Sequence, residues 1–235
     1  MVDQSESHSD SNCSYWIKRW EKDQIAFHKP EVHRMLIKHQ KMLSANGKPK
    51  NVFVPLCGKT LDLKWLIDQG IDTVGLDAAQ TALQQVFTES GQEWVESSVS
   101  LLGAEGKLFS SKDGQLKLYC GNMMTFSEEI AGTFDAVWDR GCIVALRRED
   151  IKRYAQIIKN ILRSGGRILV ELLQFDVSIM DDITSPTKPP PPFPMYEQDL
   201  KNLYEPECYV EFVDQESRTL QGKDIIAATY LVVKK

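Results

Sequence analysis

Residues 51–77 read NVFVPLCGKTLDLKWLIDQGIDTVGLD, and this stretch decides the fold. Its opening, 51–55, is a short apolar run after a polar loop, which is typical of a buried strand. Apolar residues at helical spacing follow, and the predicted helix stops at Gly70. A second apolar run, 72–76, ends at Asp77. Strand, helix and strand in this order predict a right-handed βαβ unit in a parallel sheet.

The alternation of strands and helices continues toward the C-terminus. An Asp-Gly pair at 113–114 lies between apolar runs and predicts a hairpin, which we interpret as an insertion over 99–118. The last strand of that hairpin is expected to join the main sheet. The other predicted elements are helices over 78–90 and 149–162, strands over 134–138 and 167–173, and an antiparallel pair over 209–213 and 225–233. The sequence therefore predicts an α/β three-layer sandwich with a mostly parallel, seven-stranded sheet.

The remaining segments divide the chain into one domain and a tail. Residues 1–14 are polar and predict a disordered tail, so the domain is expected to span 15–235. Aromatic and apolar residues over 15–45 predict a helical lid. Six prolines lie within 176–195, which predicts an extended surface loop. That loop is either a spacer or a lid over a site at the end of the preceding strand.

Composition excludes several classes of protein. The chain has 235 residues, of which 42% are hydrophobic and 26% charged, so it can bury a sizeable core. Its net charge of -5 disfavours a nucleic-acid partner, which would require a basic field. All four histidines lie at or before His39, which rules out a Ser…Asp…His triad and a zinc deaminase. We therefore expect no catalytic metal.

Cysteine usage and hydropathy indicate a compartment. The five cysteines are scattered without a Cys-x-x-Cys pair, which predicts reduced thiols in a cytoplasmic protein. No apolar run approaches the ~20 residues of a membrane span, and residues 1–14 lack the apolar core of a secretory signal. We expect neither a membrane nor a nucleic-acid partner, and a monomer is the default.

Residues that directly follow the parallel strands are candidates for a site, because ligands of open α/β sheets bind there. Asp77 follows Gly58 by about the ~20 residues that separate a nucleoside-binding turn from its ribose carboxylate. Alternatively, Asp77 only caps the next helix. The turn at Gly58 has a single glycine rather than G-x-G-x-x-G, which suits a nucleoside ligand without phosphate, such as S-adenosylmethionine.

Several motifs resemble the thiopurine S-methyltransferase family. They are FVPLCGKT at 53–60, KW at 64–65, VGLD at 74–77, LYC at 118–120 and FDAVWDRG at 134–141. The similarity is in register over about residues 16–167 and looser beyond. It implies a Rossmann-like class I methyltransferase that uses S-adenosylmethionine. The chain departs from the family pattern at Asp77, where the family has Glu, at Asn122-Met123, where it has Ser-Ile, and in a longer Pro-rich loop.

The resemblance also implies site residues, in addition to those that the spacing of the motifs predicts. The predicted cofactor-binding residues are Trp16, Trp20, Phe27, Leu56, Gly58, Asp77, Asn122, Met123 and Arg140. Phe27 matches the position where the substrate ring packs in the family, although Trp16, Trp20 and Phe27 could instead form a hydrophobic clasp. Aromatic faces attract a sulfonium cation. Arg140 is expected to hold a thiolate or, alternatively, to pair with Asp139 or Asp77.

The resemblance implies an S-methyltransferase that acts on small aromatic or heterocyclic thiols such as thiopurines, and the sequence leaves small sulfur or selenium anions open as acceptors. Transfer by in-line displacement depends on positioning and desolvation, and an acidic thiol requires no strong base. Asp139 is a candidate for assistance through water. Two alternatives stay open at this point, an NAD(P)-dependent reductase on a Rossmann sheet and a non-catalytic sensor of adenosine ligands. The sequence leaves undecided whether Arg218 reaches the substrate.

Overall fold

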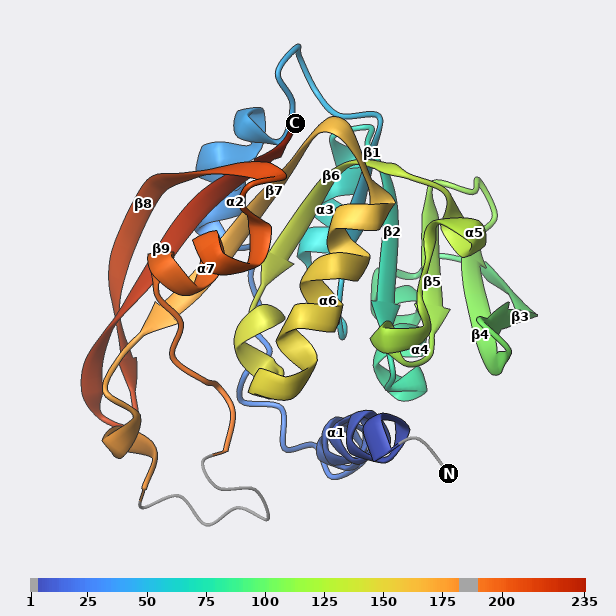
Figure 1. The fold of residues 1–235 in the computed structure, drawn as a ribbon. Helices are drawn as coiled ribbons and strands as arrows, with labels where there is room; N and C mark the ends of the chain where they lie inside the picture. The colour runs from blue at the N-terminus through green and yellow to red at the C-terminus, as the bar shows by residue number, and fades with distance from the viewer. Residues whose placement is uncertain (1–3, 182–189) are drawn as a thin grey trace.

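The computed structural model describes residues 4–181 and 190–235, which form a single mixed sheet flanked by helices (Figure 1). Within these residues the sheet has nine strands in the order β3-β4-β5-β2-β1-β6-β7-β9-β8. The central strands β5, β2, β1, β6 and β7 are parallel, and the outer strands pair antiparallel. The parallel strands are β1 (Asn51–Val54), β2 (Asp72–Asp77), β5 (Leu116–Cys120), β6 (Phe134–Arg140) and β7 (Leu162–Gln174). The parallel centre agrees with the fold expected from the sequence.

Helices cover both faces of the sheet, which gives the predicted three layers. One face packs against α6 (Arg148–Ile161) and α7 (Glu197–Tyr204), through residues such as Tyr154 and Ile158. The other face packs against α2 (Arg34–His39), α3 (Asp62–Asp68) and α4 (Gln80–Ser90). Because β1, β2 and β6 are largely buried on both faces, their sequences are mostly apolar instead of strictly alternating.

The strand count differs from the expected seven, because the hairpin region contributes two strands beyond the predicted one. The turn at 112–115 joins β4 (Ala104–Ser111) to β5, as the Asp-Gly pair predicts. The other further strand, β3 (Trp94–Leu101), precedes β4 in the chain and pairs with it at the edge of the sheet. In β3 only Leu101 is buried, so the strand has no apolar face that a sequence pattern could reveal.

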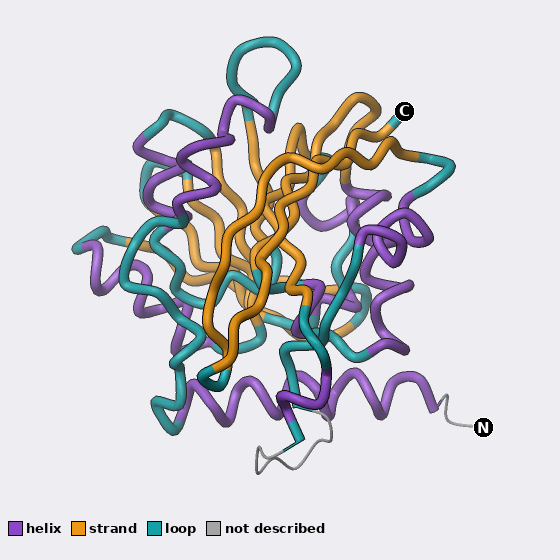
Figure 2. The backbone as a smooth tube through the Cα atoms, turned by 90° about the vertical axis from the view of Figure 1, so that its left-hand side faces the viewer, coloured by secondary structure: helices purple, strands orange, loops and turns teal. Residues whose placement is uncertain are grey.

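The N-terminal segment also differs from its prediction. Helix α1 runs from Gln4 to Glu21, so residues 4–14 are helical in the structure instead of a disordered tail, and residues 1–3 lie outside the described part. Once a helix has nucleated, each added residue costs little, which allows a polar segment to extend it. Figures 1 and 2 show α1 crossing the molecule beneath the carboxyl ends of the parallel strands.

The rest of the predicted lid over 15–45 is only partly helical. After α1 the chain is irregular up to α2, which continues into a short 3-10 helix, η1 (Gln40–Leu43). Within the predicted Pro-rich loop, residues 182–189 lie outside the described part. On its far side the backbone N–H of Phe193 donates to the carbonyl of Val144 at 2.7 Å, so this end of the loop is held beside the short 3-10 helix that follows β6.

The closing strands are longer than the sequence pattern indicates. They are β8 (Cys208–Leu220) and β9 (Lys223–Lys234), and β9 lies between β7 and β8. Short elements complete the fold: η2 (Met123–Thr125), α5 (Glu128–Ala131), η3 (Ile143–Ala145) and η4 (Val177–Met180). The long β8–β9 hairpin brings its tip toward the carboxyl ends of the parallel strands, where it lines the site described below.

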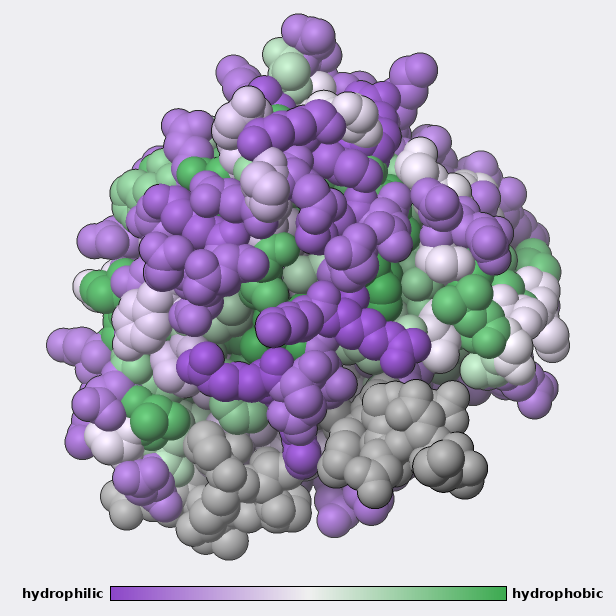
Figure 3. Space-filling model, in the orientation of Figure 1, coloured by the Kyte–Doolittle hydropathy of each residue, from purple (hydrophilic) through white to green (hydrophobic). Residues whose placement is uncertain are grey.

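The surface in the view of Figure 3 is mostly hydrophilic, and its hydrophobic residues are scattered in small groups. Exposed large hydrophobic side chains include Val95 and Leu102 in the β3–β4 hairpin and Tyr209 and Phe212 on β8. Among the helices that the structure describes, none is long and apolar enough to cross a membrane.

Candidate active site

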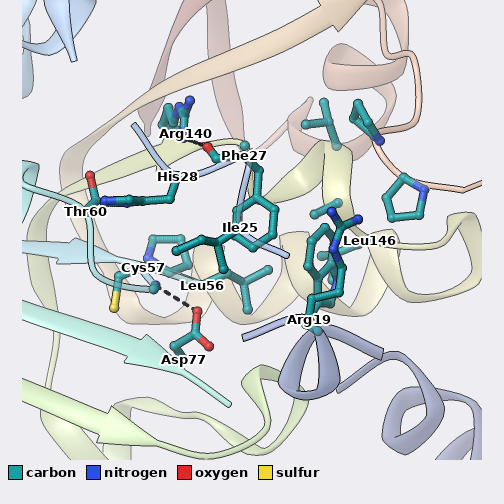
Figure 4. A pocket seen from close by; sticks show the side chains of 18 of the residues that line it. Arg19, Ile25, Phe27, His28, Leu56, Cys57, Thr60, Asp77, Arg140 and Leu146 are labelled. Atoms are coloured by element: carbon teal, nitrogen blue, oxygen red, sulfur yellow. Dashed lines mark hydrogen bonds between the residues drawn. The ribbon is translucent and has the colours of Figure 1, made fainter. Parts of the chain in front are cut away.

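A cavity of about 860 Å³ lies at the carboxyl ends of the parallel strands. It is lined by the β1–α3 turn, the ends of β2 and β6, the segment that follows α1, and the β8–β9 tip. Figure 4 shows Asp77 and Arg140 at opposite sides of this cavity, with Ile25 and Phe27 between them. We call the end near Asp77 the nucleoside-type end and the end near Arg140 the acceptor end, after the roles that the sequence predicts for these two residues.

The β1–α3 turn forms one wall and adopts an unusual backbone. Leu56 has a φ of 42° and Gly58 a φ of 51°, both in the left-handed region. Such a conformation costs about 1–2 kcal/mol for a residue with a side chain. A Cβ at Gly58 would lie 2.6 Å from Trp20 Cζ2, so glycine is also required for space. The single glycine of this turn thus lets α1 close against it.

Asp77 lies at the end of β2, and its carboxylate joins two backbone segments. Its Oδ2 accepts from the Gly58 N–H and its Oδ1 from the Ala79 N–H, each at 2.8 Å. Burial raises the pKa of Asp77, and these hydrogen bonds oppose the shift. Each carboxylate oxygen has room for a further donor. Asp77 consequently orders the turn before α4 and can still accept hydroxyl donors from a ligand.

An aromatic cluster closes the cavity from the side of α1. Trp16 and Trp20 pack edge-on against Phe27, with centroids 5.2 and 5.5 Å away. The Arg19 guanidinium lies over the Phe27 ring at 5.3 Å from its centroid, a cation–π contact that the sequence reasoning missed. All four of these residues line the cavity. The aromatic segment is therefore a clasp and a cavity wall together.

Arg140 is held at the acceptor end without either partner considered from sequence. Its Nη1 donates to the Phe27 carbonyl at 3.3 Å, and its Nε lies 4.0 Å from Glu171 Oε1. The Nε atom is buried and has no hydrogen-bond partner among the described residues. Burying an N–H group without a hydrogen-bond partner costs free energy. This atom is therefore a position where a ligand can accept a hydrogen bond.

Asp139 precedes Arg140 on β6, and successive strand residues point to opposite faces. It is fully buried and accepts from Tyr154 Oη at 2.7 Å and from the Ile143 N–H at 3.2 Å. Burial raises its pKa to about 6, against these hydrogen bonds. It does not line the cavity, so the structure places the candidate for water-mediated assistance in the packing against α6.

Asn122 and Met123 follow β5 and line the cavity beside Asp77. The Asn122 side chain accepts from the Met124 N–H at 2.9 Å and so begins η2. Met123 is almost fully buried. The structure therefore brings both predicted residues to the nucleoside-type end.

Glu171 and His33 were missed by the sequence reasoning, and Arg218 was left undecided. Glu171 and Arg218 line the acceptor end, and the two side chains form a bidentate pair with distances of 3.0 and 2.6 Å. His33 Nε2 lies 3.2 Å from Glu171 Oε2. The only available signal was a glutamate inside the apolar run RILVELL at 167–173. A carboxylate in a buried strand requires a partner.

The model of the thiopurine S-methyltransferase family matches residues 11–228.

The chain belongs to the thiopurine S-methyltransferase family.

Relatives within this family align over most of the chain. The thiopurine S-methyltransferase of Panthera leo is 33% identical over 228 residues, which cover 94% of this chain and 89% of the relative. The Rattus norvegicus enzyme is 32% identical over 201 residues, or 85% of this chain and 80% of its own length. The chain is therefore a methyltransferase, which replaces the reductase alternative.

Solved structures of lower identity share the fold. A Burkholderia thailandensis 1,6-didemethyltoxoflavin-N1-methyltransferase, solved with bound 1,6-didemethyltoxoflavin and S-adenosylhomocysteine, aligns with a TM-score of 0.65 at 14% identity. That alignment covers 100% of this chain and 92% of the other. TehB from Haemophilus influenzae aligns with a TM-score of 0.59 at 17% identity, over 95% of this chain and 67% of its own. The fold is that of class I methyltransferases.

Proposed function

We propose that this member of the thiopurine S-methyltransferase family transfers the methyl group of S-adenosylmethionine to the sulfur of small aromatic or heterocyclic thiols. The observation that carries the proposal is the cavity with two chemically different ends. One end has the Asp77 carboxylate, and the other has the buried Nε of Arg140 without a partner. Phe27 lies between them and offers an aromatic wall.

The residues near Asp77 fit the cofactor. Asp77 keeps acceptor capacity for two ribose hydroxyls, and Asn122 and Met123 line the same end, where an adenine would lie. Leu56 and Gly58 belong to the turn that lines this end of the cavity, with Trp20 packed against Gly58. Bound there, S-adenosylmethionine supplies an electrophilic methyl group carried by a sulfonium. Trp16 and Trp20 exclude water from this part of the cavity.

The acceptor end suits a thiolate. Arg140 cannot act as a base, because its guanidinium stays protonated, but it can donate to a sulfur anion. Free thiols have a pKa of roughly 8.5, so aromatic thiols, which are more acidic, are ionised without a strong base. Burial raises the pKa of Cys57 and of Cys142 well above the ordinary value, so these two thiols of the chain stay protonated.

Two measurements test this function. Calorimetry should detect binding of S-adenosylmethionine and S-adenosylhomocysteine but not of NADPH. A turnover assay with radiolabelled methyl donor should show transfer to thiophenols and heterocyclic thiols and far less to matched phenols and anilines. Binding of both sulfur nucleosides without any turnover would make the protein a sensor and refute the enzyme proposal. Equal transfer to phenols would refute sulfur specificity.

Variants of arginine test the role of Arg140. The substitution Arg140→Gln should lower kcat/KM for thiols by about 10- to 100-fold, the effect of losing a charged hydrogen bond, with a much smaller change in cofactor affinity. The matched control is Arg163→Gln, which removes an arginine that pairs with Asp135 outside the cavity. Equal losses in cofactor affinity and kcat/KM would place Arg140 on the cofactor instead.

A further inference from the structure

Glu171 is a buried carboxylate at the acceptor end that methyl transfer as described above does not use. It lies on β7 beside Arg140, which is its register partner on β6. Only 3% of its side chain is exposed, yet the residue lines the cavity. A buried charge requires compensation, and the way in which Glu171 is compensated decides how much positive charge remains for a ligand.

The first compensating group is Arg218 on β8, whose donors are largely used by carboxylates. Its Nη1 and Nη2 donate to the two oxygens of Glu171, at 3.0 and 2.6 Å. Its Nε donates to Glu216 Oε1 at 2.6 Å. His33 Nε2 lies 2.7 Å from Nη2. Arg218 is therefore an arginine engaged by two carboxylates, and it has little capacity left for an anionic ligand.

The second group is Arg140, which Glu171 approaches without a hydrogen bond. The 4.0 Å between Arg140 Nε and Glu171 Oε1 is too long for one, but the charges attract at this distance. Burial opposes ionisation of Glu171, but the hydrogen bond with His33 and the charges of His33, Arg218 and Arg140 outweigh it and lower the pKa to about 2. Glu171 is consequently an anion over the whole working range of pH.

The charges of the arginines and carboxylates at this end balance. Arg140 and Arg218 contribute two positive charges, and Glu171 and Glu216 contribute two negative ones. His33 adds a positive charge beside Glu171 only when its imidazole is protonated. Arg34 also contacts Glu216, but 70% of its side chain is exposed and water screens it. A thiolate can accept a hydrogen bond from Arg140 Nε, a buried donor that has no partner among the described residues. A second anionic group near Arg140 would meet the Glu171 carboxylate, while the two Nη atoms of Arg218 already donate to that carboxylate.

We propose that Glu171 is a specificity-determining residue that makes the acceptor end select thiols without a further negative charge and discriminate against thiols that carry a carboxylate. This inference rests on the proposed thiol methylation. The two arginines then have different roles. Arg218 compensates the negative charge of Glu171, and Arg140 faces the acceptor. The residues Leu173, Met180 and Ile225, which line the same end, favour an uncharged and apolar acceptor body.

A matched pair of acceptors tests the selectivity. We would use 4-mercaptobenzoate and 4-mercaptobenzamide, which share the ring and the position of the sulfur and differ by one charge. The wild-type enzyme should methylate the benzamide with a kcat/KM about tenfold or more higher, as expected for an uncompensated charge near a carboxylate. In Glu171→Gln this preference should fall by about tenfold or reverse, mainly through KM for the benzoate.

Control variants separate charge from structure. Glu171→Asp keeps the charge and should keep the preference. Asp214→Asn removes a carboxylate on the same strand as Arg218, paired with Lys38 outside the cavity, and should leave the preference unchanged. Thermal unfolding of each variant establishes that it folds, and the wild-type preference tests the inference even if Glu171→Gln does not fold.

The outcomes distinguish this inference from the proposed function. A wild-type preference for the benzoate, or a ratio in folded Glu171→Gln within twofold of wild type, would overturn the role of Glu171 while leaving thiol methylation intact. Calorimetric titration of both thiols in the presence of S-adenosylhomocysteine requires no turnover. Selective binding of the benzamide without methylation would refute the proposed function and support the selectivity. Failure of both thiols to bind would overturn both.

Discussion

Replacing Asp77 by alanine should separate its structural role from its role toward a ligand. The carboxylate accepts from the buried N–H groups of Gly58 and Ala79, each at 2.8 Å. Each orphaned group costs about 1–3 kcal/mol, or roughly 2–6 kcal/mol for both. Burial itself disfavours the carboxylate and raises its pKa, so part of this loss is offset. We expect a net loss of about 2–3 kcal/mol in the free energy of unfolding.

The same substitution removes the expected acceptor of the ribose hydroxyls. Loss of charge-assisted hydrogen bonds should weaken binding of S-adenosylhomocysteine by about 1–3 kcal/mol, or about 5- to 150-fold in Kd. Calorimetric titration measures the affinity, and denaturant unfolding measures the stability. Asp72→Ala is the matched control, because Asp72 is an exposed aspartate at the opposite end of β2. It should change neither quantity by more than about 0.5 kcal/mol.

The two measurements can fail separately. A loss of stability with unchanged cofactor affinity would show that Asp77 only orders the turn before α4, and the nucleoside-type end would then be assigned wrongly. An unchanged free energy of unfolding in Asp77→Ala would show that the two backbone hydrogen bonds do not stabilise the fold. Asp77→Asn, which keeps the shape but loses the charge, should fall between wild type and Asp77→Ala in cofactor affinity.

Two further predictions concern the wall of the cavity and the packing behind it. Gly58→Ala should weaken cofactor binding at least tenfold, because the added Cβ would displace Trp20 and the left-handed backbone would cost about 1–2 kcal/mol more. In a Trp20→Ala background only the backbone cost should remain. Equal losses of affinity in both backgrounds would contradict the steric explanation. Asp139 has its pKa raised by burial from 3.8 to about 6, so it contributes about 3 kcal/mol of stability that is present below pH 3.8 and lost as the pH rises through 6. The stability of wild type relative to Asp139→Asn should therefore grow as the pH falls from 7 to 4 in urea unfolding, and a difference independent of pH would refute the shift.

The parallel core was predictable because its signals are local. The runs that became β1, β2, β6 and β7 are mostly apolar, as is typical of strands buried on both faces. The positions of Asp77, Arg140 and Asn122 followed as well, since the carboxyl ends of parallel strands meet at one edge. By contrast, β3 has a polar sequence and is held by its pairing with β4, which no periodicity reveals.

Within the site, the sequence determined which residues follow the strands, and the tertiary structure decided what they face. Asp139 and Arg140 are neighbours on one strand, so pleating sends only one of them into the cavity, and burial against Tyr154 settles which. Glu171 meets Arg218 and His33 across large separations in the sequence. Whether an arginine is free to bind a ligand depends on which carboxylate lies beside it, because electrostatic interactions act through distance in space rather than along the chain.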